Sequence, residues 1–128
     1  MTGKKLKILL IEDVVIAQKI GAITLKKLNC SVQVDAAGNG IGALELFKTH
    51  RHDVVLMDLG LPDINGIEVA KQMRALDTDK KHIPIVALTA HDDENYRQSC
   101  KDVGMDNFIE KPLTLEACKK VFDRLGLL

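Results

Sequence analysis

The fold of this chain is decided by the stretch Val54-Val55-Leu56-Met57-Asp58-Leu59-Gly60-Leu61-Pro62-Asp63-Ile64-Asn65-Gly66. Four apolar residues lead directly to Asp58, and turn residues follow. A short apolar run that is rich in valine and bounded by turn residues indicates a strand buried on both faces. Asp58 would then lie at the carboxyl end of that strand, which is the edge of an open parallel sheet where ligands bind. A carboxylate at that edge can act as metal ligand, base or nucleophile, but Asp58 alone could equally cap the next turn.

Four further segments have strand-like patterns. Residues 5–12 (KLKILLIE) and 83–88 (IPIVAL) contain apolar runs, and residues 107–110 (NFIE) form a shorter one. Residues 31–36 (SVQVDA) alternate between apolar and polar, which is typical of a more exposed edge strand. Together with residues 54–58, these segments predict five strands.

Apolar residues at helical spacing separate these strands. The pattern predicts helices at residues 14–28, 41–49, 66–76 and 92–103, and a last helix that is capped by Thr114 and runs to Arg124. We expect Asp13 to cap the first helix, Asn29 to close it, and Gly104 to follow the fourth. The side chains expected to face the core are Ile16, Ile20, Ile23 and Leu28; Ala43, Leu44 and Phe47; Ile67, Val69, Ala70 and Met73; and Leu115, Cys118, Val121, Phe122 and Leu125.

Composition limits the possible functions of the chain. Its 128 residues fit one domain, and 46% hydrophobic residues suffice for a core. The formal net charge is zero, so we expect no binding of nucleic acid or of an anionic membrane surface. No apolar stretch approaches the roughly 20 residues of a membrane span. Cys30, Cys100 and Cys118 are odd in number and widely spaced, which predicts reduced thiols in a cytoplasmic protein.

Strand and helix alternate five times, which predicts an α/β fold with parallel strands and right-handed crossovers. The carboxyl ends of parallel strands share one edge, where Glu12, Asp13, Asp58, Thr89 and Lys111 would meet. Three carboxylates in one place repel each other, so a cation such as Mg²⁺ is expected among them. The lysine and the hydroxyl add donors for an anion. The combination predicts a pocket for a phosphoryl group.

In their order and positions, these residues resemble the receiver domain of two-component response regulators. The resemblance covers essentially the whole chain and implies a single receiver domain over residues 1–128. The implied fold is the flavodoxin-like, doubly wound (βα)5 fold with five parallel strands in the order 2-1-3-4-5. Residues 87–90 and 104–113 resemble receivers of hybrid sensor kinases more than those of transcription factors. The residues that carry the family resemblance are Glu12-Asp13, Asp58 with Pro62 and Gly66, Thr89-Ala90, Phe108 and Lys111-Pro112.

The resemblance implies a role for each of these residues. Asp58 would accept a phosphoryl group. Mg²⁺, or alternatively Mn²⁺, would be held by Glu12, Asp13, Asp58 and the backbone carbonyl of Gly60.

The same resemblance implies a conformational switch. Thr89 and Lys111 would bind the phosphoryl group, and the Lys111–Pro112 bond would be cis, as is usual in this family. Phe108 would be the switch aromatic, turning inward as Thr89 moves. We expect Gly60 and His91 to tune the lifetime of the phosphoaspartate, although His91 could equally be an ordinary exposed loop residue.

The implied function is phosphoryl-accepting signalling, and the chain would not be a turnover enzyme. The donor would be a histidine kinase or a histidine phosphotransfer domain. A downstream protein would read the face formed by the fourth helix, fifth strand and fifth helix.

Three other functions have sequence requirements of their own. A receiver-like scaffold that is never phosphorylated would have no need of the intact polar set. A flavin carrier would need a hydroxyl- and glycine-rich loop in place of Glu12-Asp13. A phosphatase of the haloacid dehalogenase type would need an aspartate at position 60.

Several polar residues have more ordinary interpretations. His50 and His52 lack a third ligand, so we expect surface residues rather than a metal site. Asp63 is predicted to be a turn residue, and Asp92 to begin the fourth helix. Tyr96 could be a partner contact or an ordinary surface tyrosine.

Overall fold

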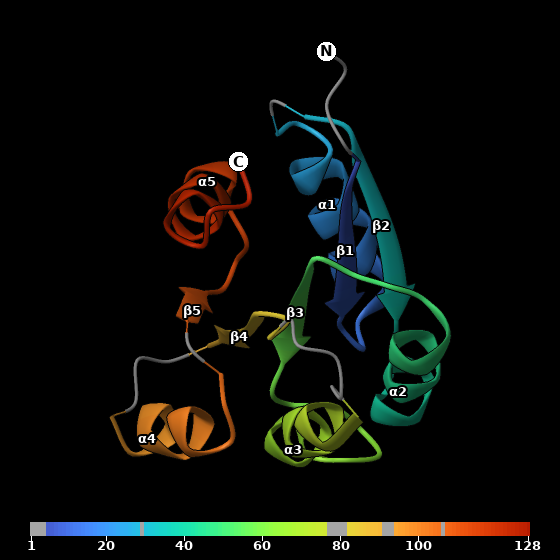
Figure 1. The fold of residues 1–128 in the computed structure, drawn as a ribbon, viewed down its shortest axis with the longest axis vertical. Helices are drawn as coiled ribbons and strands as arrows, with labels where there is room; N and C mark the ends of the chain where they lie inside the picture. Colours follow the sequence, from blue (N-terminus) through green and yellow to red (C-terminus); the bar gives the residue numbers. More distant parts are fainter. Residues whose placement is uncertain (1–4, 29, 77–81, 91–93, 106) are drawn as a thin grey trace.

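The computed structural model describes residues 5–28, 30–76, 82–90, 94–105 and 107–128, and for residues 94–96 it describes the backbone alone. In this part of the chain, helices pack on both faces of one sheet (Figure 1). The strands are β1 (Leu6–Ile11), β2 (Val32–Ala37), β3 (Val54–Asp58), β4 (Ile85–Thr89) and β5 (Asn107–Glu110). The helices are α1 (Val15–Leu25), α2 (Gly40–Thr49), α3 (Gly66–Leu76), α4 (Glu94–Asp102) and α5 (Leu115–Arg124).

The sheet has the strand order β2-β1-β3-β4-β5, and every neighbouring pair is parallel. This arrangement confirms the predicted doubly wound α/β fold. β2 lies at one margin, as its alternating pattern predicts. The register pairs Ile11 with Met57 and Asp58 with Leu88, so the carboxyl ends of the central strands lie side by side.

Two hydrophobic layers cover the two faces of the sheet. Alternate strand residues such as Leu9 and Met57 pack with α2, α3 and α4, whereas Ile8 and Leu56 pack with α1 and α5. Every residue of β3 and of β4 is buried, because helices lie on both sides of these strands. Among the described helices, none combines the length and the apolar character that a membrane span requires.

The predicted buried face of the first helix is wrong at three of its four residues, whereas Leu28 is buried as predicted. Ile16, Ile20 and Ile23 are 56% to 65% exposed, and the residues of α1 that are buried are Gly21 and Leu25. A side chain at position 21 would clash with β1, because its Cβ would lie 2.9 Å from a Leu10 methyl group. α1 is apolar on more than one side, so spacing alone does not reveal which side packs on the sheet.

The ends of α1 and of β4 also differ from the prediction. α1 begins after Val14, which is its N-cap and has no side-chain capping bond, so Asp13 does not cap the helix. The helix ends at Leu25, and Asn29 lies outside the described residues. β4 begins at Ile85, after Pro84, whose ring nitrogen has no hydrogen to donate to a neighbouring strand.

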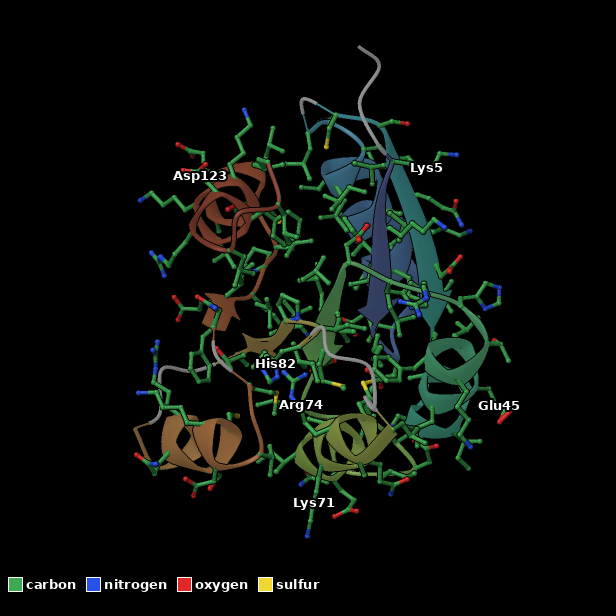
Figure 2. All side chains as sticks on the ribbon, viewed as in Figure 1. Lys5, Glu45, Lys71, Arg74, His82 and Asp123 are labelled. Carbon is green, nitrogen blue, oxygen red and sulfur yellow. The ribbon has the colours of Figure 1, made fainter. Side chains whose placement is uncertain are left out.

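Arg74 lies near the amino-terminal ends of β4 and β5, opposite the carboxyl ends of the strands. It reaches from the last turn of α3 toward the sheet (Figure 2). Its Nη1 donates to the carbonyl of Ile83 and its Nη2 to that of Gly104, each over 2.6 Å. Gly104 has a φ of +89°, which confirms its predicted role as the residue that ends α4. The arginine therefore ties α3 to the entries of β4 and β5.

Candidate functional site

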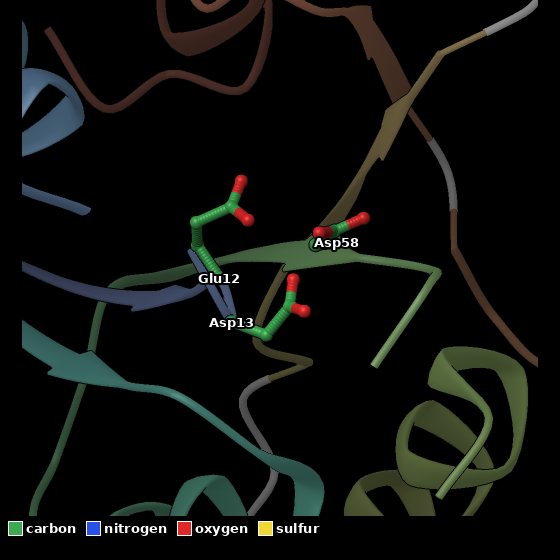
Figure 3. Close-up of side chains that lie close together, drawn as sticks. All are labelled: Glu12, Asp13 and Asp58. Carbon is green, nitrogen blue, oxygen red and sulfur yellow. The ribbon is translucent and has the colours of Figure 1, made fainter. Parts of the chain in front are cut away.

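Three carboxylates meet where β1 and β3 end. One oxygen from each of Glu12, Asp13 and Asp58 lies within 4.8 Å of the other two (Figure 3). Glu12 and Asp58 are only 3% and 7% exposed, whereas Asp13 is open to solvent. Glu12 is held by β2, because its backbone N–H donates to the carbonyl of Ala37 over 2.9 Å.

Lys111 joins this cluster from the end of β5. Its Nζ donates to Oδ2 of Asp58 over 3.0 Å and lies 3.1 Å from Oε1 of Glu12. Its backbone N–H donates to the carbonyl of Thr89 over 2.7 Å, which ties the segment after β5 to β4. The peptide bond between Lys111 and Pro112 is cis.

Burial and charge shift the ionisation of this group. Loss of solvent raises the pKa of Glu12 above its usual value, and the nearby charge of Asp58 adds to the increase. Partial burial by itself would lower the pKa of Lys111, but its hydrogen bonds with Asp58 and Glu12 outweigh this effect and raise it. Lys111 therefore remains an ammonium at neutral pH.

The donor set suits a divalent cation. With the three carboxylates ionised, one ammonium leaves two net negative charges, which a single divalent ion would cancel. Hard carboxylate oxygens are the ligands that Mg²⁺ prefers, and the exposed Asp13 leaves room for the water molecules that this ion retains. The residues present therefore fit the expected metal.

Thr89 and Gly60 lie beside Asp58. Thr89 is the last residue of β4, is 8% exposed, and directly follows Leu88, the residue paired with Asp58. The backbone N–H of Gly60 donates to Oδ1 of Asp58 over 3.1 Å. His91, the other residue expected to tune the site, lies outside the described residues.

The loop that carries Gly60 is tied to α2 by Asp63, a residue predicted to lie in a turn. Its Oδ1 accepts from the backbone N–H groups of Gly40 and Ile64 over 2.8 Å each, and its Oδ2 accepts from that of Ile41 over 3.0 Å. Asp63 therefore caps a helix that begins 23 residues before it. A local sequence pattern contains no signal of such a contact.

We expect Asp63→Asn to destabilise the fold in a pH-dependent way. The bond from the N–H of Gly40 is the largest of the effects that lower the pKa of Asp63 below its usual 3.8. A lowered pKa adds stability above pH 3.8, and this stability is lost as the pH falls through the folded-state value. The midpoint of urea unfolding should therefore be lower for the variant than for the wild type at pH 7, and the gap should close in acid. A gap that is constant from pH 7 to pH 3 would contradict this account.

The two histidines that were predicted to lie on the surface differ from each other in the structure. His52 is not on the surface as expected: it is buried, and its Nε2 lies 2.9 Å from Oδ2 of Asp35. His50 is exposed, as predicted. The three cysteines are free thiols in the structure, and two of them, Cys100 and Cys118, are buried. Asp92 and the side chain of Tyr96 lie outside the described parts of the chain.

Comparison with known proteins agrees with this geometry. Residues 8–123 match the family described as the response regulator receiver domain. The aerobic respiration control sensor protein ArcB of Escherichia coli is 36% identical over 112 residues, which cover 88% of this chain and 14% of that protein. Hybrid signal transduction histidine kinase B of Dictyostelium discoideum is 35% identical over 117 residues, covering 84% of this chain and 6% of that kinase. The chain thus spans only a small part of the length of these relatives.

Solved structures give the same result. Chemotaxis protein CheY4 of Vibrio cholerae is 27% identical, with a TM-score of 0.85 over 94% of this chain and 98% of that one. A sensor histidine kinase receiver domain from Pseudomonas aeruginosa, solved with a magnesium ion in its active site cleft, is 29% identical, with a TM-score of 0.82 over 94% and 97% of the two chains. The family match over residues 8–123, together with the strand order and the acidic cluster, leads to one conclusion: this chain belongs to the response regulator receiver domain family of two-component systems.

Proposed function

We propose that this chain, acting as one domain over residues 1–128, accepts a phosphoryl group on Asp58 from the phosphohistidine of a histidine kinase or a histidine phosphotransfer domain. The observation that carries this proposal is the 3.0 Å contact of Lys111 Nζ with Asp58 Oδ2 beside a cluster of three carboxylates. A buried carboxylate can attack phosphorus, and an ammonium beside it can then neutralise the negative charge of the bound phosphoryl group.

The transfer would form one O–P bond at Asp58 and break the N–P bond of the donor, whose imidazole leaves with the bonding pair. Lys111 and Thr89 would then bind the oxygens of the phosphoryl group. The chemistry that Mg²⁺ or Mn²⁺ supplies when bound is neutralisation of charge on those oxygens. The residues proposed to hold the ion are Glu12, Asp13, Asp58 and, through its backbone carbonyl, Gly60.

Phosphorylation would shift the population between two arrangements of the face formed by α4, β5 and α5. Thr89 would move toward the phosphoryl group and Phe108 would turn inward behind it. A downstream protein in the cytoplasm would read the new surface. We also propose that Gly60, which has no side chain to block water, and His91 set the lifetime of the modified Asp58.

Support for a protein donor comes from the exposed face of α1. Its apolar residues continue into an open groove of about 430 Å³ between α1 and the segment after β5. Ile20 lines this groove together with Glu12 and Lys111, so the groove reaches the site itself. Isoleucines at positions 16, 20 and 23 follow helical spacing, which suits a second helix lying along α1. We therefore propose that a helix of the phosphohistidine donor packs on α1.

We expect Ile20→Lys to slow phosphoryl transfer from the donor protein at least about tenfold, because it puts a charge into an apolar contact. Ile20 is 56% exposed, so the fold should be unaffected. The measurement is the rate of transfer from a phosphorylated histidine phosphotransfer domain that is active on the wild type. Ile41→Lys is the matched control, since Ile41 is 61% exposed, close to the value for Ile20, but lies on α2. Equal slowing by both variants, or slower uptake from acetyl phosphate in Ile20→Lys, would contradict docking on α1.

One experiment tests the proposed function. Incubation with acetyl phosphate and Mg²⁺, followed by intact-mass spectrometry, should add one phosphoryl group to the wild type and none to Asp58→Asn. Transfer from purified histidine kinases, with the same variant as control, would then identify a donor. If the wild type takes up no phosphoryl group from either source, the chain is a receiver-like scaffold and the proposal is wrong.

A further inference from the structure

A cationic side chain covers the ring of Phe108. The guanidinium carbon of Arg97, on α4, lies 4.7 Å from the centre of the Phe108 ring, on β5. Both side chains are half-buried at the surface. At this distance the cation is attracted by the negative face of the ring. A phenylalanine ring has no hydroxyl, so contacts with its faces and edges are what orient it.

Phe108 lies on the face of the sheet to which Thr89 also belongs. The register pairs Phe108 with Ala87 and Glu110 with Thr89, and side chains two residues apart on a strand point the same way. The ring packs at the margin of the core layer that lies under α2, α3 and α4. Ala87 is small, so little bulk stands on β4 between the ring and Thr89. An inward turn of the ring toward Thr89 would carry it away from Arg97.

We propose that Arg97 is a positioning residue that holds the Phe108 ring in the orientation seen in the structure and so favours the unphosphorylated arrangement. This inference rests on the proposed function, because it assigns a regulator to that switch. The contact is made in the arrangement that the structure shows, and the proposal is that an inward turn of the ring would break it. A contact made in only one of two states shifts the equilibrium toward that state. Removing the guanidinium should therefore make the phosphorylated arrangement easier to reach.

The test uses beryllofluoride with saturating Mg²⁺ as a phosphoryl mimic, and isothermal titration calorimetry gives its apparent dissociation constant. Arg97→Ala is expected to bind the mimic about two- to fivefold more tightly than the wild type, the range for an exposed cation–π contact. Arg97→Lys, which retains a cation, should bind with an affinity between the two. Gln98→Ala is the control on α4, since Gln98 pairs with Asp102 and is exposed. It should bind as the wild type does.

The second half of the test separates the switch from simple charge effects. In a Phe108→Leu background, the Arg97→Ala change should not tighten the binding of beryllofluoride, because there is no ring to hold and only the loss of charge remains. Loss of a positive charge would by itself weaken the binding of an anion, so tighter binding has the opposite sign. Unchanged or weaker binding in Arg97→Ala, or the same gain with and without Phe108, would overturn the inference. Failure of the wild type to bind beryllofluoride would instead overturn the proposed function.

Discussion

Gly66→Ala is expected to lower the free energy of unfolding by about 2–3 kcal/mol, as overpacking at a tight site does. A Cβ at this position would lie 2.8 Å from the Cα of Leu59 and 2.9 Å from the carbonyl oxygen of Asp58. Both are backbone atoms and cannot turn aside as a flexible side chain can. The Gly66 N–H also donates to the carbonyl of Leu59 over 3.2 Å, so the loop after β3 closes directly on the start of α3. Urea unfolding followed by circular dichroism measures the change.

The clash would also disturb the site, because it displaces the backbone that carries Asp58. Binding of Mg²⁺ by Gly66→Ala should therefore weaken along with stability. Gly60→Ala is the matched control: its Cβ would meet one atom within 4 Å, Oδ1 of Asp58 at 4.0 Å. That variant should be within about 0.5 kcal/mol of the wild type in stability. Equal stability of the two variants would show that the loop can yield at position 66.

Lys111→Met is expected to change two properties in opposite directions. Removing the ammonium leaves Glu12 and Asp58 without the cation that lies 3.1 Å and 3.0 Å from them. One positive charge fewer near the site should tighten Mg²⁺ binding about tenfold, which corresponds to roughly 1.4 kcal/mol. Phosphoryl transfer to Asp58 should slow at least about tenfold, because a donor to the phosphoryl oxygens is gone. Calorimetry at pH 8 and a phosphotransfer assay give the two numbers.

Two variants control this experiment. Lys111→Arg retains the positive charge, so its Mg²⁺ affinity should stay close to that of the wild type. Lys101→Met removes an exposed lysine of α4 and should alter neither property. Weaker Mg²⁺ binding in Lys111→Met would mean that the lysine side chain shapes the site more than its charge opposes the metal. Undiminished phosphoryl transfer would rule out its role as a phosphoryl ligand.

Local patterns predicted most of the secondary structure and the composition of the site. The predicted bounds of β3, β5 and α3 agree with the structure residue for residue. The bounds of β3 could be predicted because its residues form a run that is buried on both faces and that ends at Asp58 and the turn after it. The meeting of Glu12, Asp58 and Lys111 also follows from the sequence, since parallel strands bring their carboxyl ends to one edge.

Other contacts were decided by the tertiary structure alone. The side of α1 that packs inward depends on the close approach of Leu10 to Gly21, because the helix is apolar on more than one side. Asp63 caps a helix 23 residues away, and Arg74 bonds a carbonyl 30 residues away.

The amino-acid sequence therefore indicated the order of the strands and helices and the polar groups that gather where the parallel strands end, because these follow from periodicity and chain direction. The tertiary structure decided which helix face is exposed and which side chains fasten the loops. Such choices depend on the shapes of surfaces that meet only when distant segments have packed together.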